Sequence, residues 1–417
     1  MAAVGNSVVI IGAGIVGLAI AHRLFREGFA VTVVDRDPAG DKASFGNAGG
    51  VAVTEVVPAS APGLVWRLPR WLLDPLGPLA VRPAHAPRLA PWLWRFWRAG
   101  RPGEVARIAS ALSALNSRVY EDLAPLLADI GLSGELNRRG ALTVYESEEG
   151  FRKDADEWSL KRSHGIEIEN LTGAEARALE PALGKIVHRA VFTPQWSHLN
   201  DPKHLVDSLR IWLQNHGVAI LAGDVANIAV SGPFDTTAEL AGGRRISAGK
   251  VVVAAGAWSG ALARRLGDRV SLESERGYNT TLPDPGVTLS REIIFAERKF
   301  VATPLRCGLR IGGAAEFGGL IAPPNFERSR ALVTLASRYL PALNTNGGTD
   351  WAGHRPATPD SLPVIGASPR RPNVFYAFGH GHLGLTQAAT TGRLIADLIS
   401  EKPPPISLAP YAIARFR

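Results

Sequence analysis

Three glycines near the N-terminus, Gly12, Gly14 and Gly17, have the spacing G-x-G-x-x-G. Such glycines allow a tight turn, a close approach of a pyrophosphate to the main chain, and close packing of a helix on a strand. The free N–H groups at the start of the following helix can bind the phosphates. Asp35, further along, can accept hydrogen bonds from ribose hydroxyls. Together these residues predict a dinucleotide-binding site.

The elements that must position these residues follow the order strand, helix, strand. The apolar run Val8–Ile11 is typical of a buried parallel strand, and Val31–Val34 is a second such strand that ends at Asp35. Between them, apolar residues recur with helical spacing. The glycines thus lie in a complete βαβ unit, which distinguishes them from a glycine-rich turn that binds nothing.

Length and composition indicate a two-domain globular protein. The chain has 417 residues, and this length is more than one nucleotide-binding domain needs. Its residues are 46% hydrophobic and 20% charged, which is typical of a globular protein. No run of 18 apolar residues exists, and the first basic residue is Arg23, so we expect neither a membrane span nor a signal peptide. The single cysteine, Cys307, fits a reducing cytoplasm.

The formal net charge is +8, yet no nucleic-acid-binding module is visible and the basic residues are spread along the chain. An unusual segment between Pro58 and Pro102 holds five of the ten tryptophans, many arginines and one acid, Asp74. Such a mixture suits a helical lid packed on the protein. It also suits peripheral contact with a membrane, here the inner face, and the two are not exclusive.

Other elements are expected downstream. Helical spacing covers Ser110–Leu127, and Ala141–Tyr145 is strand-like. Asp201 precedes Pro202 as a helix N-cap. The strand Val374–Phe378 leads through a glycine-rich turn to a helix that begins near Leu383. That helix N-terminus could stabilise negative charge on a reduced ring.

Five stretches carry a family resemblance when they are taken together and in order. They are IGAGIVGLAIAHRL (11–24), SFGNAGG (Ser44–Gly50), VVVAAGAWS (Val251–Ser259), GHRPATPDSLPVIG (Gly353–Gly366) and FGHGHLGLT (Phe378–Thr386). The chain resembles the FAD-dependent D-amino-acid dehydrogenases, within the wider D-amino-acid oxidase and glycine oxidase fold. The resemblance covers nearly the whole chain, and implies noncovalent FAD and oxidative deamination by hydride transfer from the substrate α carbon to the flavin.

The expected fold class is α/β: a Rossmann-type FAD-binding domain interleaved with a mixed α+β substrate domain built on a mainly antiparallel sheet. We assign residues 1–52, 198–265 and 350–417 to the FAD-binding domain. The substrate or cap domain then takes residues 53–197 and 266–349, including the Trp/Arg-rich insertion at 58–102.

The resemblance implies catalytic positions. Arg355 falls in the G-x-R-P stretch that holds the family's carboxylate-binding arginine; a structural pairing near Asp360 is the alternative. A guanidinium can bind a carboxylate through two parallel hydrogen bonds. Tyr278 could lend its hydroxyl to the same carboxylate. His380 and His382 lie in the turn expected beside the ring. We expect no metal site.

The resemblance also implies a cofactor cradle. Its pyrophosphate region comprises Gly12, Gly14, Ile15, Val16 and Gly17, and Asp35 and Arg36 hold the adenosine end. The ribityl chain and flavin lie beside Ser44, Asn47, Ala48 and Gly49, and Val225 meets the adenine. The remaining positions are Gly256, Gly381, Leu383 and Gly384.

Substrate and electron acceptor stay open at this point. A D-amino acid is expected, with a cyclic imino acid such as cis-4-hydroxy-D-proline as the alternative. The WSHLND stretch around His198 departs from the glycine-bearing form of the broad dehydrogenases. The acceptor is oxygen, a quinone or a carrier protein. Two other classes are a nicotinamide-dependent dehydrogenase and a flavin-bearing subunit of a larger electron-transfer complex.

Overall fold

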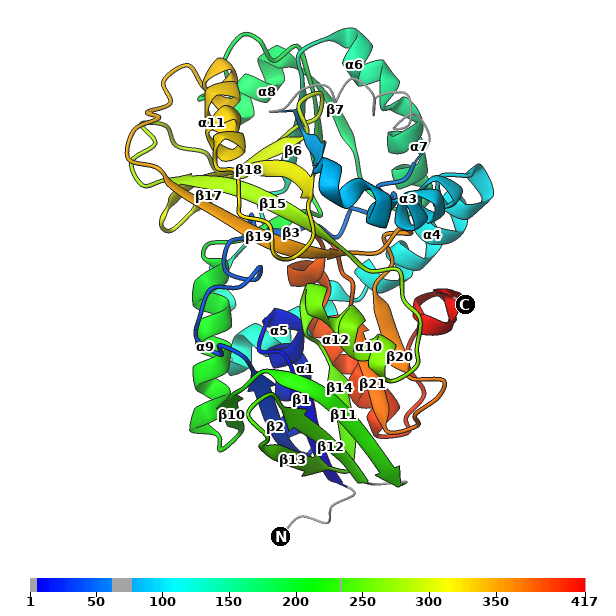
Figure 1. Cartoon of the computed structure of the whole chain (residues 1–417). Helices are drawn as coiled ribbons and strands as arrows, with labels where there is room; N and C mark the ends of the chain where they lie inside the picture. Colours follow the sequence, from blue (N-terminus) through cyan, green and yellow to red (C-terminus); the bar gives the residue numbers. More distant parts are fainter. Residues whose placement is uncertain (1–5, 62–76, 233–234, 417) are drawn as a thin grey trace.

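The computed structural model describes residues 6–61, 77–232 and 235–416. It has two lobes, each built on one large sheet (Figure 1). The first sheet has six strands, in the order β10 (Ala219–Ala222), β2 (Ala30–Asp35), β1 (Ser7–Ile11), β14 (Lys250–Val253), β21 (Val374–Phe378) and β20 (Val364–Ala367). All neighbours are parallel except β20, which runs antiparallel to β21. This is the expected Rossmann-type sheet.

Both faces of this sheet are covered, which explains its continuous apolar strands. Val8 and Ile10 point into a core shared with α1 (Ile15–Arg26), α9 (Pro202–Asn215) and α12 (Gly384–Ile399). Val9 and Ile11 point into a second core. That core is closed by α10 (Ser259–Arg265) and by a small antiparallel sheet of β11 (Val225–Gly232), β12 (Asp235–Leu240) and β13 (Arg245–Ala248).

The second lobe contains a nine-stranded, mainly antiparallel sheet, as expected. Its main path is β19 (Thr349–Ala357), β15 (Glu273–Leu282), β18 (Gly308–Phe317), β17 (Phe300–Leu305), β16 (Glu292–Phe295), β6 (Ala141–Tyr145), β8 (Arg189–Thr193) and β7 (Glu169–Thr172); β4 (Leu79–Val81) pairs with β18. Residues 350–357 lie in this sheet, although our boundaries group them with the FAD-binding segments. The domain boundaries stay a prediction.

The two faces of the nine-stranded sheet differ in chemistry. Ile293 and Phe295 point into a core with α8 (Gly173–Leu179) and α11 (Glu327–Tyr339). Glu292 and Ile294, which alternate with them, line a cavity that faces the first lobe. A short antiparallel sheet has β9 (Ser197–Leu199) at its centre, between β3 (Gly50–Val51) and β5 (Leu136–Asn137).

The helix expected over Ser110–Leu127 is in fact two helices, α4 (Pro102–Asn116) and α5 (Val119–Asp129). No glycine or proline marks the break, so the periodicity continues across it. Asn116, the last residue of α4, is buried, and its amide donates to the carbonyl oxygens of Val53 and Glu55 and accepts from Gln387. The small helices α6 (Glu148–Lys153) and α7 (Ala155–Ser163) complete this lobe.

The Trp/Arg-rich insertion is only partly described, because residues 62–76 lie outside the described ranges. Its described part contains β4 and, after it, the helix α3 (Ala86–Ala99). On one side, Trp92 and Phe96 stack and pack against Phe317. On the other side, Trp94 and Trp97 stack on each other while 58% and 44% exposed. One face of the helix therefore packs against the rest of the protein, and the opposite face presents aromatic rings to solvent.

Candidate active site

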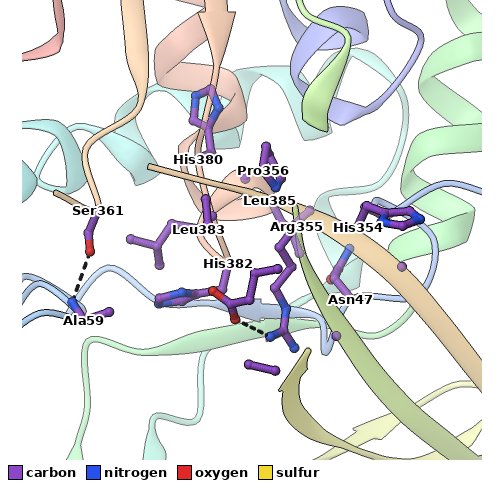
Figure 2. Close-up of a pocket in the computed structure, with 18 of the residues that line it drawn as sticks. Asn47, Ala59, His354, Arg355, Pro356, Ser361, His380, His382, Leu383 and Leu385 are labelled. Carbon is purple, nitrogen blue, oxygen red and sulfur yellow. Dashed lines mark hydrogen bonds and ion pairs between the residues drawn. The ribbon is translucent and has the colours of Figure 1, made fainter. Parts of the chain in front are cut away.

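One cavity of about 1620 Å³ runs between the two sheets, from the glycine-rich turn after β1 to the polar face of the nine-stranded sheet. Figure 2 shows part of its wall, with Asn47, His354, Arg355 and His382 around the same space. Every predicted site residue except Gly17 lines it. Residues far apart in the chain are thus brought together around one cavity.

The glycines after β1 are required by close packing. Gly12 has φ +114°, and a Cβ there would lie 2.4 Å from the carbonyl oxygen of Ala254. A Cβ on Gly17 would lie 1.9 Å from the oxygen of Gly12, so α1 can approach β1 only with glycine at that position. Gly14 borders the cavity at the start of α1, where a Cβ would meet only the Ser44 hydroxyl, at 3.4 Å. Its main chain is therefore open to a ligand.

Asp35 ends β2 and organises the turn around it. One carboxylate oxygen accepts from the Ala13 N–H at 2.7 Å, and the other accepts from Lys42 Nζ at 3.1 Å. Lys42 was not predicted, because nothing local links it to Asp35. Arg36 follows Asp35 in the chain, and its guanidinium lies 3.7 Å from the centre of the Trp258 ring. At this end of the cavity, the carboxylate of Asp35 lies with the cationic groups of Arg36 and Lys42, a combination that suits a ribose and phosphates.

The loop from Ser44 to Gly50 is shaped by its own side chains. The Ser44 hydroxyl accepts from the Ile15 N–H at 3.0 Å, which satisfies one free donor at the start of α1. Asn47 donates to the Ser44 carbonyl oxygen and accepts from the Gly49 N–H. Gly49 has φ +84°, which favours glycine. These hydrogen bonds therefore fix the shape of the loop where it lines the cavity.

Two residues of the nine-stranded sheet, which sequence reasoning missed, attach this loop to the second lobe. Arg310 on β18 donates to the carbonyl oxygens of Phe45 and Asn47, at 3.2 and 2.7 Å. Asn279 on β15 donates to the oxygen of Gly46. These are bonds from side chains to main chain between segments more than 230 positions apart. No sequence motif could have indicated them.

The C-terminal turn brings α12 to the cavity. The Gly381 N–H donates to the Pro356 oxygen at 2.9 Å, which ties the turn to β19. Gly384 begins α12 and Leu383 precedes it without a capping side chain. Gly384 and Leu385 line the cavity, so the positive end of the helix dipole is directed at it. The predicted helix start near Leu383 is confirmed.

The two turn histidines differ. His380 is buried, and its Nε2 lies 3.0 Å from the Thr391 hydroxyl. Burial lowers the pKa of His380 to about 3, so this imidazole is neutral at physiological pH. His382 is exposed, and Figure 2 places it on the side of the cavity that holds Arg355. Of the two, His382 is better placed to reach a ligand.

Arg355 lies on β19, opposite Glu275 on β15, and forms an ion pair with it. Arg355 Nη1 lies 2.8 Å from Glu275 Oε1, and longer contacts reach the carbonyl oxygens of Ala314 and Gly313. The alternative pairing near Asp360 does not form, because Asp360 is paired with Arg415 at 2.8 Å. The guanidinium thus lies on the cavity wall with an acidic neighbour that was not predicted.

The carboxylate-binding role predicted for Tyr278 conflicts with the structure. Tyr278 borders the cavity, but its side chain belongs to the core on the opposite face of the sheet. Its hydroxyl donates its one proton to Glu316 at 2.9 Å and accepts from the Asn325 N–H. The cause is strand alternation: Gly277 and Asn279 take the cavity face, so Tyr278 turns away.

Glu292 is a buried acid on the cavity wall that the sequence did not reveal. It is 2% exposed and accepts from the Trp196 indole N–H at 3.0 Å. A Cβ on Gly50 would lie 2.5 Å from its Oε2, so glycine at that position makes room for the carboxyl group. Burial raises the pKa of Glu292 to about 8, and the negative charge of Glu55 adds to the rise. The group is therefore largely protonated at neutral pH.

His198 is buried in β9, opposite Gly50 of β3, and is absent from the described residues that line the cavity. Burial lowers its pKa to about 4. An influence of His198 on substrate choice would therefore act through Gly50 and the loop before it.

Comparisons with known proteins agree with this architecture. Residues 7–398 match the family described as FAD dependent oxidoreductase. The chain is 34% identical to a D-amino-acid oxidase of Bradyrhizobium diazoefficiens, over 99% of each chain. It is 34% identical to a D-amino acid dehydrogenase of Paramagnetospirillum magneticum, over 98% of each. The chain belongs to the FAD-dependent oxidoreductase family.

Solved structures show the same fold. A glycine oxidase from Geobacillus kaustophilus superposes with a TM-score of 0.75 at 22% identity, over 98% of each chain. An L-proline dehydrogenase from P. horikoshii gives 0.74 at 20% identity, over 98% of this chain and 97% of the other. At these identities the likeness establishes the fold.

The residues present fit the FAD that the family implies. Gly256 and Gly381 line the cavity with positive φ, and a Cβ on either would meet no atom within 4 Å, so the main chain is bare toward the cavity. FAD carries two phosphates, and this cavity has cations and a helix N-terminus at the Asp35 end. In the described part of the chain, no cluster of His, Cys, Asp or Glu could hold a metal ion. No described helix is long and apolar enough to cross a membrane.

Proposed function

We propose that this protein oxidises D-amino acids with noncovalently bound FAD. The observation that carries the proposal is that one cavity joins the Rossmann turn, the N-terminus of α12 and the guanidinium of Arg355. The names of two relatives, D-amino-acid oxidase and D-amino acid dehydrogenase, support this substrate class. Noncovalent binding is supported by Cys307, which is exposed and not among the residues that line the cavity.

Arg355 is the proposed carboxylate anchor. A guanidinium has five N–H donors, and within the described part of the chain its Nε–H has no hydrogen-bond partner. A substrate carboxylate held there would have its α carbon at a fixed position in the cavity. FAD, when bound, would supply the redox chemistry as the acceptor of the hydride from the substrate α carbon. With loss of that hydride and of one proton from its nitrogen, the amine would become an imine, which water would hydrolyse to a keto acid and ammonia.

The remaining predicted residues support the cofactor. We assign Asp35, Arg36 and Lys42 to the adenosine and phosphate end, and the loop from Ser44 to Gly50 to the ribityl chain and flavin. The first turn of α12 presents free N–H groups, whose partial positive charge favours electron-rich atoms placed against it. His380, neutral and bonded to Thr391, holds the turn in shape and does not act as a cationic acid.

The test has two parts. Denaturation and chromatography should release FAD, and FMN should be absent. Dye reduction should then be measured across matched D- and L-amino acids, with glycine, D-proline and cis-4-hydroxy-D-proline included. We expect faster turnover of D-amino acids by the chain alone. Activity only with L-amino acids would overturn the D-amino acid assignment, and an inactive flavoprotein would favour a subunit of a larger complex.

A further inference from the structure

Arg355 and Glu275 form a pair of opposite charges that faces the cavity. They are direct cross-strand partners on β19 and β15, and both line the cavity wall. Their side chains are 27% and 23% exposed, so neither is sealed in the core. Figure 2 shows the ion pair as a dashed line at Arg355.

Each partner keeps hydrogen-bonding capacity. One oxygen of Glu275, Oε1, accepts from Arg355, while Oε2 has no hydrogen-bond partner within the described residues. Arg355 likewise keeps its Nε–H. The site therefore offers a free anionic acceptor next to a free cationic donor.

A zwitterionic α-amino acid has the complementary arrangement, since its carboxylate and ammonium groups are attached to the same carbon. We propose that Glu275 binds the α-amino group of the substrate while Arg355 binds its carboxylate. The inference rests on the proposed function and adds how the amine is selected. A carboxylate that lacks an amine would meet the negative charge of Glu275 with no compensating contact, so the pair rejects simple carboxylates.

The position of Glu275 on the cavity wall favours a binding role over a purely structural one. Glu273, two positions earlier on β15, pairs with His85 at 3.1 Å and is not among the described residues that line the cavity. Glu275 is the acid of this strand that reaches the cavity, and Arg355 is its one ion-pair partner among the described residues. Glu273 thus provides a matched control on the same strand.

The experiment compares two ligands that the enzyme cannot oxidise, 2-aminoisobutyrate and isobutyrate, which differ by the amine. Their binding is followed by the change in absorption of the bound flavin in wild type, Glu275→Gln and Glu273→Gln. We expect Glu275→Gln to weaken 2-aminoisobutyrate by roughly 10- to 100-fold, the size of a lost charged hydrogen bond. The Glu275→Gln variant should bind isobutyrate as tightly as the wild type or more tightly. The Glu273→Gln variant should bind both ligands as the wild type does. Glu275→Asp, which keeps the charge, should retain part of the preference for the amine.

The other outcomes are decisive. Equal weakening of both ligands by Glu275→Gln would show that Glu275 only holds Arg355 in place, and the inference would be wrong. Unchanged binding of both would also overturn it. If the wild-type flavoprotein binds neither ligand, the carboxylate site at Arg355 fails, and the proposed function fails with it. Each result is read from the flavin spectrum and does not depend on turnover.

Discussion

The guanidinium of Arg310 lies 2.7 Å from the carbonyl oxygen of Asn47, and this bond joins the nine-stranded sheet to the loop that borders the cofactor cavity. A second N–H···O bond from the same side chain reaches Phe45. Because the loop carbonyls are held from the second lobe, this lobe also shapes the cavity wall that the loop forms.

Arg310→Gln should therefore weaken FAD binding. We expect roughly a 10-fold rise in the FAD dissociation constant, since one or two charged hydrogen bonds to the loop are lost. Fluorescence quenching on rebinding to apoprotein measures the constant. Arg306→Gln, at a 55% exposed arginine close by in sequence, is the control and should leave it unchanged. Equal FAD affinity in wild type and Arg310→Gln would show that the loop holds its shape without this contact.

Arg355→Ala should keep FAD and lose most turnover. The lost contacts to a substrate carboxylate should reduce transition-state binding by roughly 2–4 kcal/mol, seen as a fall in kcat/KM. Arg355→Lys should recover only part of this, because an ammonium group lacks the planar fork. Steady-state dye assays with FAD content as the control decide it. Wild-type kcat/KM in both variants would remove Arg355 from the site.

Glu292 should make stability fall as the pH rises. An ordinary glutamate carboxyl group has a pKa of 4.5, whereas burial raises the pKa of Glu292 to about 8, so between these values the folded state holds a proton that the unfolded state has lost. The free energy of unfolding should then decrease by up to about 1.4 kcal/mol per pH unit between the two values. Glu292→Gln cannot ionise and can still accept from Trp196, so its curve should be flatter.

Urea unfolding at several values of pH from about 5 to about 8 measures this difference. Glu104→Gln, at a carboxyl group on the surface, is the control and should follow the wild type. Parallel curves for wild type and Glu292→Gln would contradict a protonated Glu292.

The exposed face of α3 should bind anionic membranes. Trp94 and Trp97 stack on the surface, the Arg101 guanidinium lies 5.2 Å from the Trp97 ring centre, and the helix has no acidic residue. We expect vesicles rich in anionic lipid to pellet the protein at low salt, and less at high salt because of screening. The double variant Trp94→Ala/Trp97→Ala should stay in solution, whereas Ile211→Ala, at another exposed apolar residue, should pellet. Absence of pelleting at low salt would leave α3 as a cavity wall alone.

The sequence by itself determined the features whose signals are local. The βαβ unit with Gly12 and Asp35 spans a few tens of residues, and each position has a steric or hydrogen-bonding requirement that its residue type reveals. The N-cap at Asp201 is a second example: its side chain accepts from the His204 N–H three positions on. The family resemblance extended this to the fold and to the residues of the cavity.

Only the tertiary structure decided which polar groups meet. Glu275 with Arg355, Arg310 with Asn47, and Glu292 with Gly50 are contacts across strands or between lobes, and their partners lie far apart in the chain. Tyr278 shows the same limit, because its strand was expected but the face it occupies depends on the register of the whole sheet. A one-residue change in register reverses every side chain of a strand, and that register is set by packing against elements hundreds of residues away.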